Sequence, residues 1–121
     1  MVQLIQGNAE NIQILDESFN GITCVFLFHE LPGEARQNVI NECYRLLKPN
    51  GTLVIADSVQ ISDSPQFIQV MENFYKIFHE AYYKDYIKDD LTERLTEAGF
   101  DVINHQSFFM TKVWSAKKIC T

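Results

Sequence analysis

Two nearly unbroken apolar runs, residues 22–28 and 52–56, stand out along the first half of the chain. Short runs of this kind are typical of strands that are buried on both faces of a parallel sheet. Between them, apolar residues recur at helical spacing and predict a helix over residues 34–47, with polar residues such as Arg36 on the opposite side. Pro49 and Gly51 end this helix and turn the chain into the second strand. The pattern therefore predicts a strand, helix, strand unit with parallel strands.

The remaining pattern extends this α/β reading in both directions. Residues 2–6 read as a short strand, and residues 10–15 read as a short helix or an irregular turn. After the second strand, an aromatic-rich helical block begins at Ser64-Pro65 and continues through residues 67–86, which predicts core packing. The last elements are a helix over residues 88–98 that ends at Gly99, then antiparallel strands near residues 100–109 and 111–118.

Length and charge narrow the classes of function. The 121 residues indicate a single domain, 1–121, and the net charge of −6 disfavours nucleic acid and anionic membrane surfaces as partners. No apolar stretch has the length of a membrane span, and the first residues carry no basic region typical of a secretory signal, so we expect a cytoplasmic protein. No set of residues has metal-ligand spacing, and we expect no metal site.

Polar residues follow both apolar runs. His29 and Glu30 come after the first, and Asp57 comes after the second. Parallel sheets bind ligands at the carboxyl ends of their strands, so these positions are candidates for a site. His29 is the best candidate for a base because histidine titrates near neutral pH, although a histidine at a strand end also often packs or caps locally. Asp57 is a candidate for contact with a substrate, or equally a solvated loop carboxylate.

Five motifs, in order, resemble the class I S-adenosylmethionine-dependent methyltransferases, in the type 11, ubiquinone/menaquinone-like branch. They are Gly7-Asn8-Ala9-Glu10, Asp16-Glu17-Ser18-Phe19-Asn20, Phe28-His29-Glu30-Leu31-Pro32, Arg45 to Leu53 and Glu97-Ala98-Gly99-Phe100. The resemblance implies a Rossmann-like sheet with strand order 3-2-1-4-5-7-6, mostly parallel with an antiparallel last strand and helices on both faces. It also implies S-adenosylmethionine as cofactor, a small-molecule acceptor, and a variable segment over residues 67–86 that often covers the acceptor.

By the same resemblance, the cofactor would contact Gly7, Asn8, Ala9, Phe28 and His29. Asn8 stands where the family has an aspartate and would accept from the adenine amine, with the Ala9 amide facing a ring nitrogen. The residues alone also allow a plain turn at Gly7-Asn8. The methyl acceptor would lie near His29 and Asp57, the two candidates for catalysis.

The sequence departs from the family in one important respect. It contains no G-x-G-x-G loop, and its motifs begin at the family's third strand, so we expect a truncated sheet. Two functions remain open: a methyltransferase, or a non-catalytic remnant or half-domain that cannot hold the cofactor alone. In either case strand 22–28 is an uncharged edge without proline, which favours pairing. Strand 2–6 could cover it, two copies could form a homodimer through it, or a separate chain could complement it.

Overall fold

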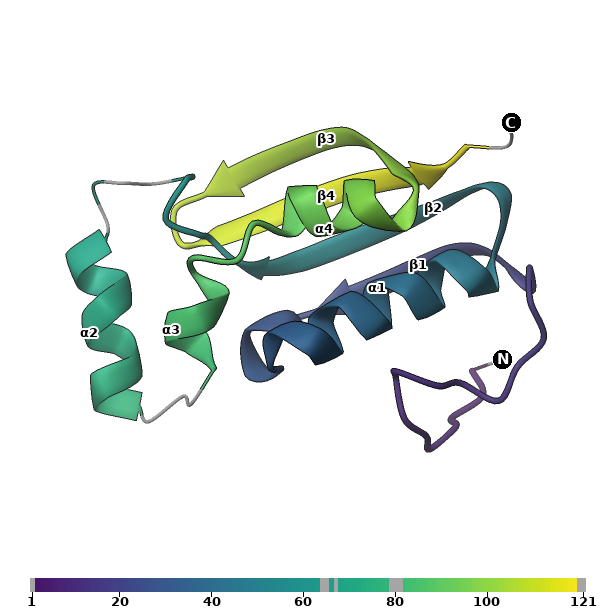
Figure 1. Cartoon of the computed structure of the whole chain (residues 1–121), viewed down its shortest axis with the longest axis horizontal. Coiled ribbons are helices and arrows are strands. Elements are labelled where there is room, and N and C mark those ends of the chain that lie inside the picture. Colours follow the sequence, from purple (N-terminus) through teal and green to yellow (C-terminus); the bar gives the residue numbers. More distant parts are fainter. Residues whose placement is uncertain (1, 64–65, 67, 79–81, 120–121) are drawn as a thin grey trace.

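The computed structural model describes residues 2–63, 66, 68–78 and 82–119. The described residues form one four-stranded sheet in the order β1-β2-β4-β3 (Figure 1). The strands are β1 (Phe19–Val25), β2 (Leu47–Ser58), β3 (Phe100–Phe108) and β4 (Thr111–Lys118). β1 is parallel to β2, while β4 is antiparallel to both β2 and β3. Three strands therefore share one direction and the last runs against them, as predicted, and the order is that expected for the last four strands of the family's sheet.

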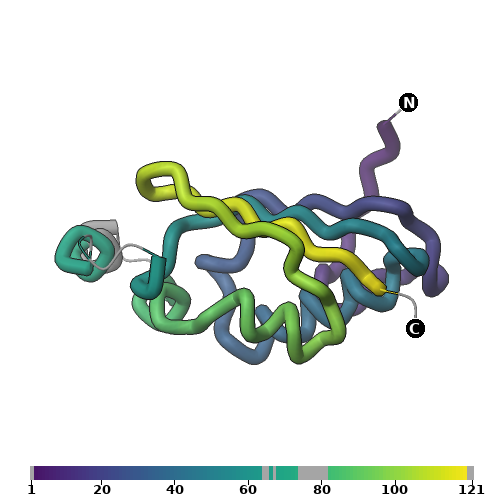
Figure 2. Tube along the Cα trace, turned by 90° about the horizontal axis from the view of Figure 1, so that it is seen from above, coloured from purple at the N-terminus to yellow at the C-terminus, as the bar shows by residue number. Residues whose placement is uncertain are grey.

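The helices α1 (Gly33–Leu46), α3 (Tyr83–Tyr86) and α4 (Leu91–Ala98) lie on one side of the sheet (Figure 2). α2 (Ile68–Phe78) stands apart from the sheet, beyond α3 (Figure 1). The second layer of helices expected on the other face is not found among the described residues. One face of the sheet is therefore left without helical cover in this part of the chain.

The core lies between the sheet and the helices that cover it. Its centre is formed by side chains at or near zero exposure, namely Val39 and Ile40 of α1, Leu53 and Ile55 of β2, Leu91 and Leu95 of α4, and Trp114 of β4. The apolar spacing of α1 was predicted correctly, but the polar side was not. Arg36 is fully buried and Glu42 is nearly so, because both find charged partners against neighbouring segments.

The ends of the elements differ from the prediction in two places. The strand predicted over residues 22–28 begins earlier, at Phe19, and stops at Val25. Phe26 adopts a left-handed conformation with φ of 51°, and Phe28 belongs to a short 3-10 helix, η1 (Phe28–Glu30). This bend takes the chain out of the sheet and points Phe28 into the core, where it is fully buried.

The strand predicted over residues 2–6 is wrong. These residues form no strand and are exposed, with Val2 and Leu4 more than four-fifths accessible. A strand needs a neighbour for its backbone groups, and among the described residues β1 pairs only with β2. The suggestion that strand 2–6 covers this edge is therefore also wrong. The irregular alternative for residues 10–15 is confirmed, since only a turn, an isolated bridge between Asn8 and Asn11, and a bend occur there.

The second half follows the prediction closely where it is described. α4 begins three residues later than expected, because the Asp90 side chain accepts a hydrogen bond from the Thr92 amide and so caps the helix at Leu91. Gly99 ends it in the left-handed conformation, with φ of 107°. The cap predicted at Ser64-Pro65 and the aromatic Phe67 lie outside the described residues. No helix in the described part is both long enough and apolar enough to cross a bilayer.

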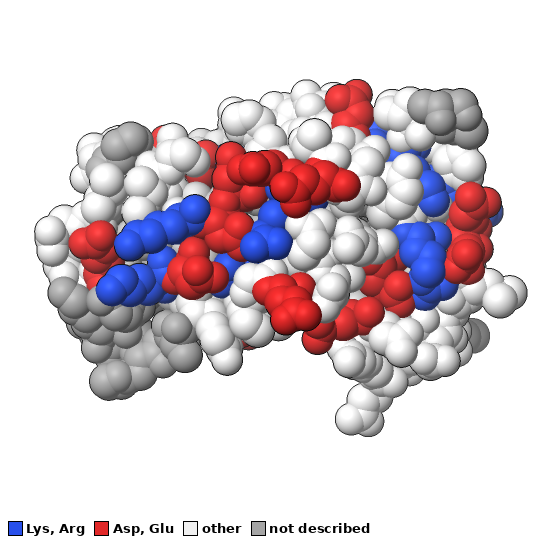
Figure 3. All heavy atoms as spheres, in the orientation of Figure 1, with Lys and Arg blue, Asp and Glu red and all other residues white. Residues whose placement is uncertain are grey.

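Acidic and basic side chains alternate over the helical side of the molecule (Figure 3). Ion pairs account for much of this pattern, including Arg45 with Asp16 and Glu42, and Arg94 with Asp89. The pair of Arg45 with Asp16 joins segments that are distant in sequence, and so do the pairs of Arg36 with Asp85 and Asp89. Two of the segments that these ion pairs hold in place pack against the candidate site described below.

Candidate functional site

The carboxyl ends of β1 and β2 meet at Asp57, which is fully buried. One carboxylate oxygen accepts a hydrogen bond from the Phe28 amide at 2.8 Å. The other accepts from the Ser58 amide and pairs with Nδ1 of His29, each at 2.8 Å. Asp57 is therefore not a solvated loop carboxylate. It anchors the turn that follows β1 to the end of β2.

His29 is held so that only one ring nitrogen faces away from this anchor. A carboxylate accepts hydrogen bonds, so the neutral imidazole donates Nδ1–H to Asp57 and carries its lone pair on Nε2. The side chain of His29 is 17% exposed, and Nε2 lies 3.8 Å from the carboxylate of Glu30, which is largely in solvent. The arrangement of buried carboxylate and oriented imidazole is the one that general bases use.

Three aromatic rings contact the imidazole. Phe26, Tyr83 and Tyr86 each present an edge-on contact to His29, with ring centroids 6.3 to 6.4 Å away. Tyr83 and Tyr86 come from α3, about 50 residues later in the chain. The structure thus brings one part of the aromatic-rich block to the site. His79 and Glu80 of that block lie outside the described residues.

The two tyrosines are tied to the end of β2 through Ser58. The hydroxyls of Tyr83 and Ser58 are 2.8 Å apart, and the Tyr86 hydroxyl donates to the Ser58 carbonyl at 2.5 Å. Burial raises the pKa of Tyr86 above its usual range, and the nearby charge of Asp57 adds to this. Burial also raises the pKa of Tyr83, against a smaller lowering by the hydrogen bond with Ser58. Both phenols are therefore held neutral beside the imidazole.

The residues expected to contact the cofactor do not assemble into one pocket within the described residues. Phe28 is fully buried in the core, whereas residues 7 and 8 are exposed. The side-chain oxygen of Asn8 accepts from the Glu10 amide at 2.9 Å, the local turn that was the alternative for this position. Ala9 is half-buried and packs against the core. The donor set present does not form an adenine site by itself.

The loop that carries these residues is fastened along α1, away from His29. Glu10 accepts from Asn38, and Glu42 accepts from the Ile12 amide at 2.5 Å. Arg45 donates to the carbonyls of Ile12 and Ile14. These anchors start five residues into α1 and continue to its last turn, whereas His29 precedes the first turn. At 1.5 Å per residue, the two groups lie at different heights along the helix.

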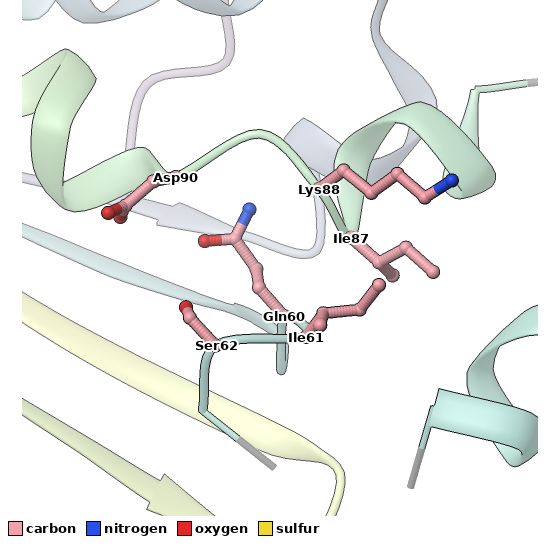
Figure 4. A pocket seen from close by; sticks show the side chains of 6 residues that line it. All are labelled: Gln60, Ile61, Ser62, Ile87, Lys88 and Asp90. Atoms are coloured by element: carbon pink, nitrogen blue, oxygen red, sulfur yellow. The ribbon is translucent and has the colours of Figure 1, made fainter. Parts of the chain in front are cut away.

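A cavity of about 270 Å³ lies beyond the tyrosines, lined by Gln60, Ile61, Ser62, Ile87, Lys88 and Asp90 (Figure 4). Ile61 and Ile87 lie side by side at one end, and the amide of Ile61 donates to the carbonyl of Ile87 at 2.9 Å (Figure 4). The Gln60 amide group is fully engaged, since it donates to the carbonyls of Tyr86 and Asp89 and accepts from the Leu91 amide. The polar groups here hold the loop to α3 and α4.

Other candidate chemistry is limited. No group of three or more His, Cys, Asp or Glu residues that could hold a metal ion occurs in the described part of the chain. His105 lies exposed on β3, opposite Trp114 in register, as expected for a residue on a strand surface.

Sequence comparison gives matches to methyltransferases over part of the chain. A family model described as a methyltransferase domain matches residues 1–55. A demethylmenaquinone methyltransferase of Listeria monocytogenes is 35% identical over 75 residues, which cover 62% of this chain and 30% of that protein. The match therefore spans less than a third of the relative's length.

Structural comparison extends the likeness over nearly the whole chain. A SAM-dependent methyltransferase from Methanosarcina mazei superposes with a TM-score of 0.71 at 16% identity, covering 95% of this chain and 66% of that one. The putative methyltransferase of Haloferax volcanii, solved in complex with the Trm112 methyltransferase activator, gives a TM-score of 0.66 at 14% identity, with coverages of 95% and 60%. At such identities the likeness establishes the fold.

Motifs, family match and fold agree. The four-stranded sheet with its reversed last strand is that of these structures, and the family match includes β1, α1 and most of β2. The Methanosarcina mazei structure is described as a SAM-dependent methyltransferase, the cofactor that the sequence motifs implied. The chain has the fold of S-adenosylmethionine-dependent methyltransferases and is similar in sequence, over residues 1–55, to a methyltransferase domain.

Proposed function

We propose that this chain supplies the proton-accepting wall of a methyltransferase site that acts on a small molecule, and that its 121 residues do not bind the cofactor unaided. S-adenosylmethionine would supply the methyl group. The observation that carries the proposal is the 2.8 Å contact between Nδ1 of His29 and the buried carboxylate of Asp57. It leaves Nε2 as the basic nitrogen at the ligand-binding end of the sheet.

The proposed roles follow from the contacts. Nε2 of His29 takes a proton from the acceptor, and the imidazolium that forms keeps its Nδ1–H on Asp57. Asp57, which is fully buried, orients the ring and does not touch the acceptor. The neutral rings of Phe26, Tyr83 and Tyr86 supply the apolar sides of the site. This proton transfer is the only step for which the described residues supply the groups.

Nitrogen NMR of the histidine rings tests the proton-accepting role without a cofactor or an acceptor. At a pH where the rings are neutral, we expect His29 to show the tautomer with its proton on Nδ1. The exposed His105 serves as an internal control in the same spectrum. Replacing Asp57 by Asn places an amide against the ring and should reverse or mix the tautomers. A proton on Nε2 of His29 in the wild-type protein would show that Nε2 is not the base.

Titration calorimetry with S-adenosylhomocysteine tests the second half of the proposal. We expect no binding heat up to millimolar concentration, because the residues assigned to adenine do not converge and no glycine-rich loop occurs in these residues. Micromolar binding by the 121-residue chain would contradict this expectation. If a second polypeptide restores binding, the chain is a complementing half. The Haloferax volcanii neighbour, which was solved with an activator protein, gives a precedent for a methyltransferase fold with a protein partner.

One observation favours the alternative of a non-catalytic half-domain that associates. β1 is an edge of the sheet, its seven residues contain no charge and no proline, and the other face of the sheet lacks helices in the described part. Val25 is 63% exposed and Phe26 is 49% exposed at its end. Such an edge is a template for pairing with a second copy.

Sedimentation velocity tests this association. We expect a dimer in equilibrium with monomer, and we expect Val25→Lys to shift the equilibrium toward monomer because a charge on an edge opposes pairing. Ile103→Lys, at an equally exposed position on the opposite edge strand, is the matched control and should leave the dimer unchanged. A wild-type chain that sediments only as a monomer at every concentration would remove the homodimer.

A further inference from the structure

Arg36 lies between the turn that carries His29 and the segment that carries the tyrosines. Its side chain is fully buried, at the start of α1. Nε donates to the carbonyl of Phe28 at 3.0 Å, the residue before His29. Nη2 donates to the carbonyl of Tyr82 at 3.1 Å, the residue before Tyr83. One guanidinium therefore joins the two sides of the site through their backbones.

Among the described residues, the carboxylates that pair with this guanidinium both come from the tyrosine side. Nη1 donates to Asp85 at 2.8 Å and to Asp89 at 2.7 Å, and the guanidinium carbon lies 5.5 Å from the centre of the Tyr86 ring. Both carboxylates belong to the segment of residues 82–89, which we call the tyrosine segment. Burying a charge is costly unless it is paired, so Arg36 keeps its place only while this segment is docked.

We infer that Arg36 is a positioning residue that latches the tyrosine segment over His29. The segment also packs into the core and is hydrogen-bonded to Ser58, at the end of β2, and to Gln60 and Ile61 in the loop that follows. Of these contacts, Arg36 alone reaches both the backbone beside His29 and the backbone beside Tyr83. Undocking the segment removes two of the three rings that flank the imidazole.

The inference rests on the proposed function only for its catalytic consequence. If His29 is the base, the latch keeps water from Nε2 and fixes the apolar walls against which an acceptor lies. If His29 has another role, the latch still determines how far the ring is exposed to solvent. The test is therefore made on exposure of the imidazole and requires neither a cofactor nor an acceptor.

Histidine modification by diethyl pyrocarbonate, followed by peptide mass spectrometry, measures that exposure residue by residue. We expect Arg36→Met to raise the modification rate of His29 about tenfold, since losing charge-assisted hydrogen bonds shifts a local opening equilibrium on that scale. His105 should react at an unchanged rate. Arg36→Lys keeps the charge but cannot reach all four partners, and it should raise the His29 rate by a smaller factor.

Arg94→Met is the matched control. Arg94 also binds Asp89, at 2.7 Å, but it contacts neither the carbonyl of Phe28 nor that of Tyr82 through any hydrogen bond in the described structure. It should change the His29 rate less than twofold if the latch is specific to Arg36. Asp85→Asn, at a side chain that is 65% exposed, removes one partner with little risk to folding and should raise the rate modestly.

The outcomes separate the alternatives. A His29 rate that is unchanged in Arg36→Lys and Asp85→Asn would overturn the latch, even if Arg36→Met does not fold. An equal increase in Arg94→Met would mean that general loosening, and not the bridge to Phe28, controls exposure. A protected His29 that carries its proton on Nε2 would leave the latch standing and remove the proposed function.

Discussion

At the scale of single residues, Asp57 shows how one buried carboxylate organises two strand ends. It accepts from the backbone after each strand and from the His29 ring, so its negative charge is met by three donors. A buried carboxylate whose oxygens accept several hydrogen bonds has its polar groups satisfied in the interior. Burial raises the pKa of the neighbouring Tyr83 and Tyr86 phenols, and the negative charge of Asp57 raises it further.

The tyrosines give a pH prediction at this scale. Burial raises the pKa of both Tyr83 and Tyr86 in the folded state. In the unfolded chain they ionise near the ordinary value of about 10, so their contribution to stability is complete below that pH and is lost as the pH rises above it. We expect the free energy of unfolding, measured with urea, to fall from about pH 10 upward.

Tyr83→Phe serves as the comparison. It removes one of the two titrating groups, so the fall above the ordinary tyrosine pKa should become shallower. An identical slope in the wild-type and variant proteins would show that Tyr83 is not buried against the site. Absorbance of phenolate in the folded protein should show that Tyr83 and Tyr86 ionise above the ordinary tyrosine pKa.

The sequence predicted some of these residues and missed others for a physical reason. His29 and Asp57 follow apolar runs, and the position of a strand end is encoded locally. Arg36 was assigned to the solvent side of its helix, because periodicity counts polar residues as outward-facing. Its partners, Asp85 and Asp89, lie about 50 residues away, and no local pattern reports such a pairing. The sequence contains Ser58 and the tyrosines, but no local pattern indicates that the tyrosines pack beside His29 or that Ser58 binds them.

At the scale of elements, both ends of α1 were predicted within one residue, whereas the strand predicted over residues 2–6 was wrong. The helix has strong periodicity and defined ends, both of which are local signals. The segment of residues 2–6 has the composition of a strand, yet a strand also requires a neighbour. Its apolar side chains are therefore exposed because the segment has no neighbouring strand, and composition does not encode such a neighbour.

Arg45 and Glu42 provide a test of how α1 holds that loop. The hydrogen bond from Arg45 lowers the pKa of Glu42 most, burial opposes this, and the Ile12 amide assists it. A lowered folded pKa stabilises the protein above the unfolded value of 4.5, and this stabilisation is lost as the pH falls through the folded value. We expect Glu42→Gln to flatten the acid side of the stability profile below that value.

Hydrogen exchange supplies the local measurement. The Ile12 amide donates to Glu42, so its exchange should accelerate in Glu42→Gln and also in Arg45→Ala, while core amides of β2 remain protected. Glu97→Gln, an exposed position on α4, is the control and should leave Ile12 unchanged. Unchanged exchange at Ile12 in both α1 variants would show that the loop is held by other contacts.

At the scale of the whole molecule, β4 lies in the interior of the sheet although it is the last strand of the described chain. Trp114 and Ala116 are fully buried, and the Trp114 indole donates to Thr92 of α4 at 3.1 Å. Lys118 donates to the carbonyls of Tyr44 and Leu47, where α1 ends and β2 begins. β4 therefore contacts both its neighbours in the sheet and the helices α1 and α4 that cover the sheet.

Trp114 carries the stability prediction at this scale. Truncating a fully buried tryptophan costs about 3 to 5 kcal/mol through lost burial and the cavity left behind. Because small domains have only about 5 to 15 kcal/mol in total, Trp114→Ala should leave the chain close to unfolding at 25 °C. Far-UV circular dichroism in urea measures this, since the chain has one tryptophan and loses its fluorescence signal.

Ile103→Ala is the control, because that side chain is 59% exposed on β3. It should change the unfolding free energy by less than about 0.5 kcal/mol. A loss below about 1 kcal/mol for Trp114→Ala would mean that β4 is not packed as the interior strand.

The position of β4 also sets the order of events when the chain is made. A ribosome releases β1, α1 and β2 first, but β2 has no neighbour on its second side until residues 111–118 have emerged. Until then, Leu53 and Ile55 lack Trp114, which belongs to the same buried core. The unpaired edge of β2 is also exposed to chaperones and to other nascent chains. The sheet therefore closes only after residues 111–118 have been made, because β4 fills the position between β2 and β3.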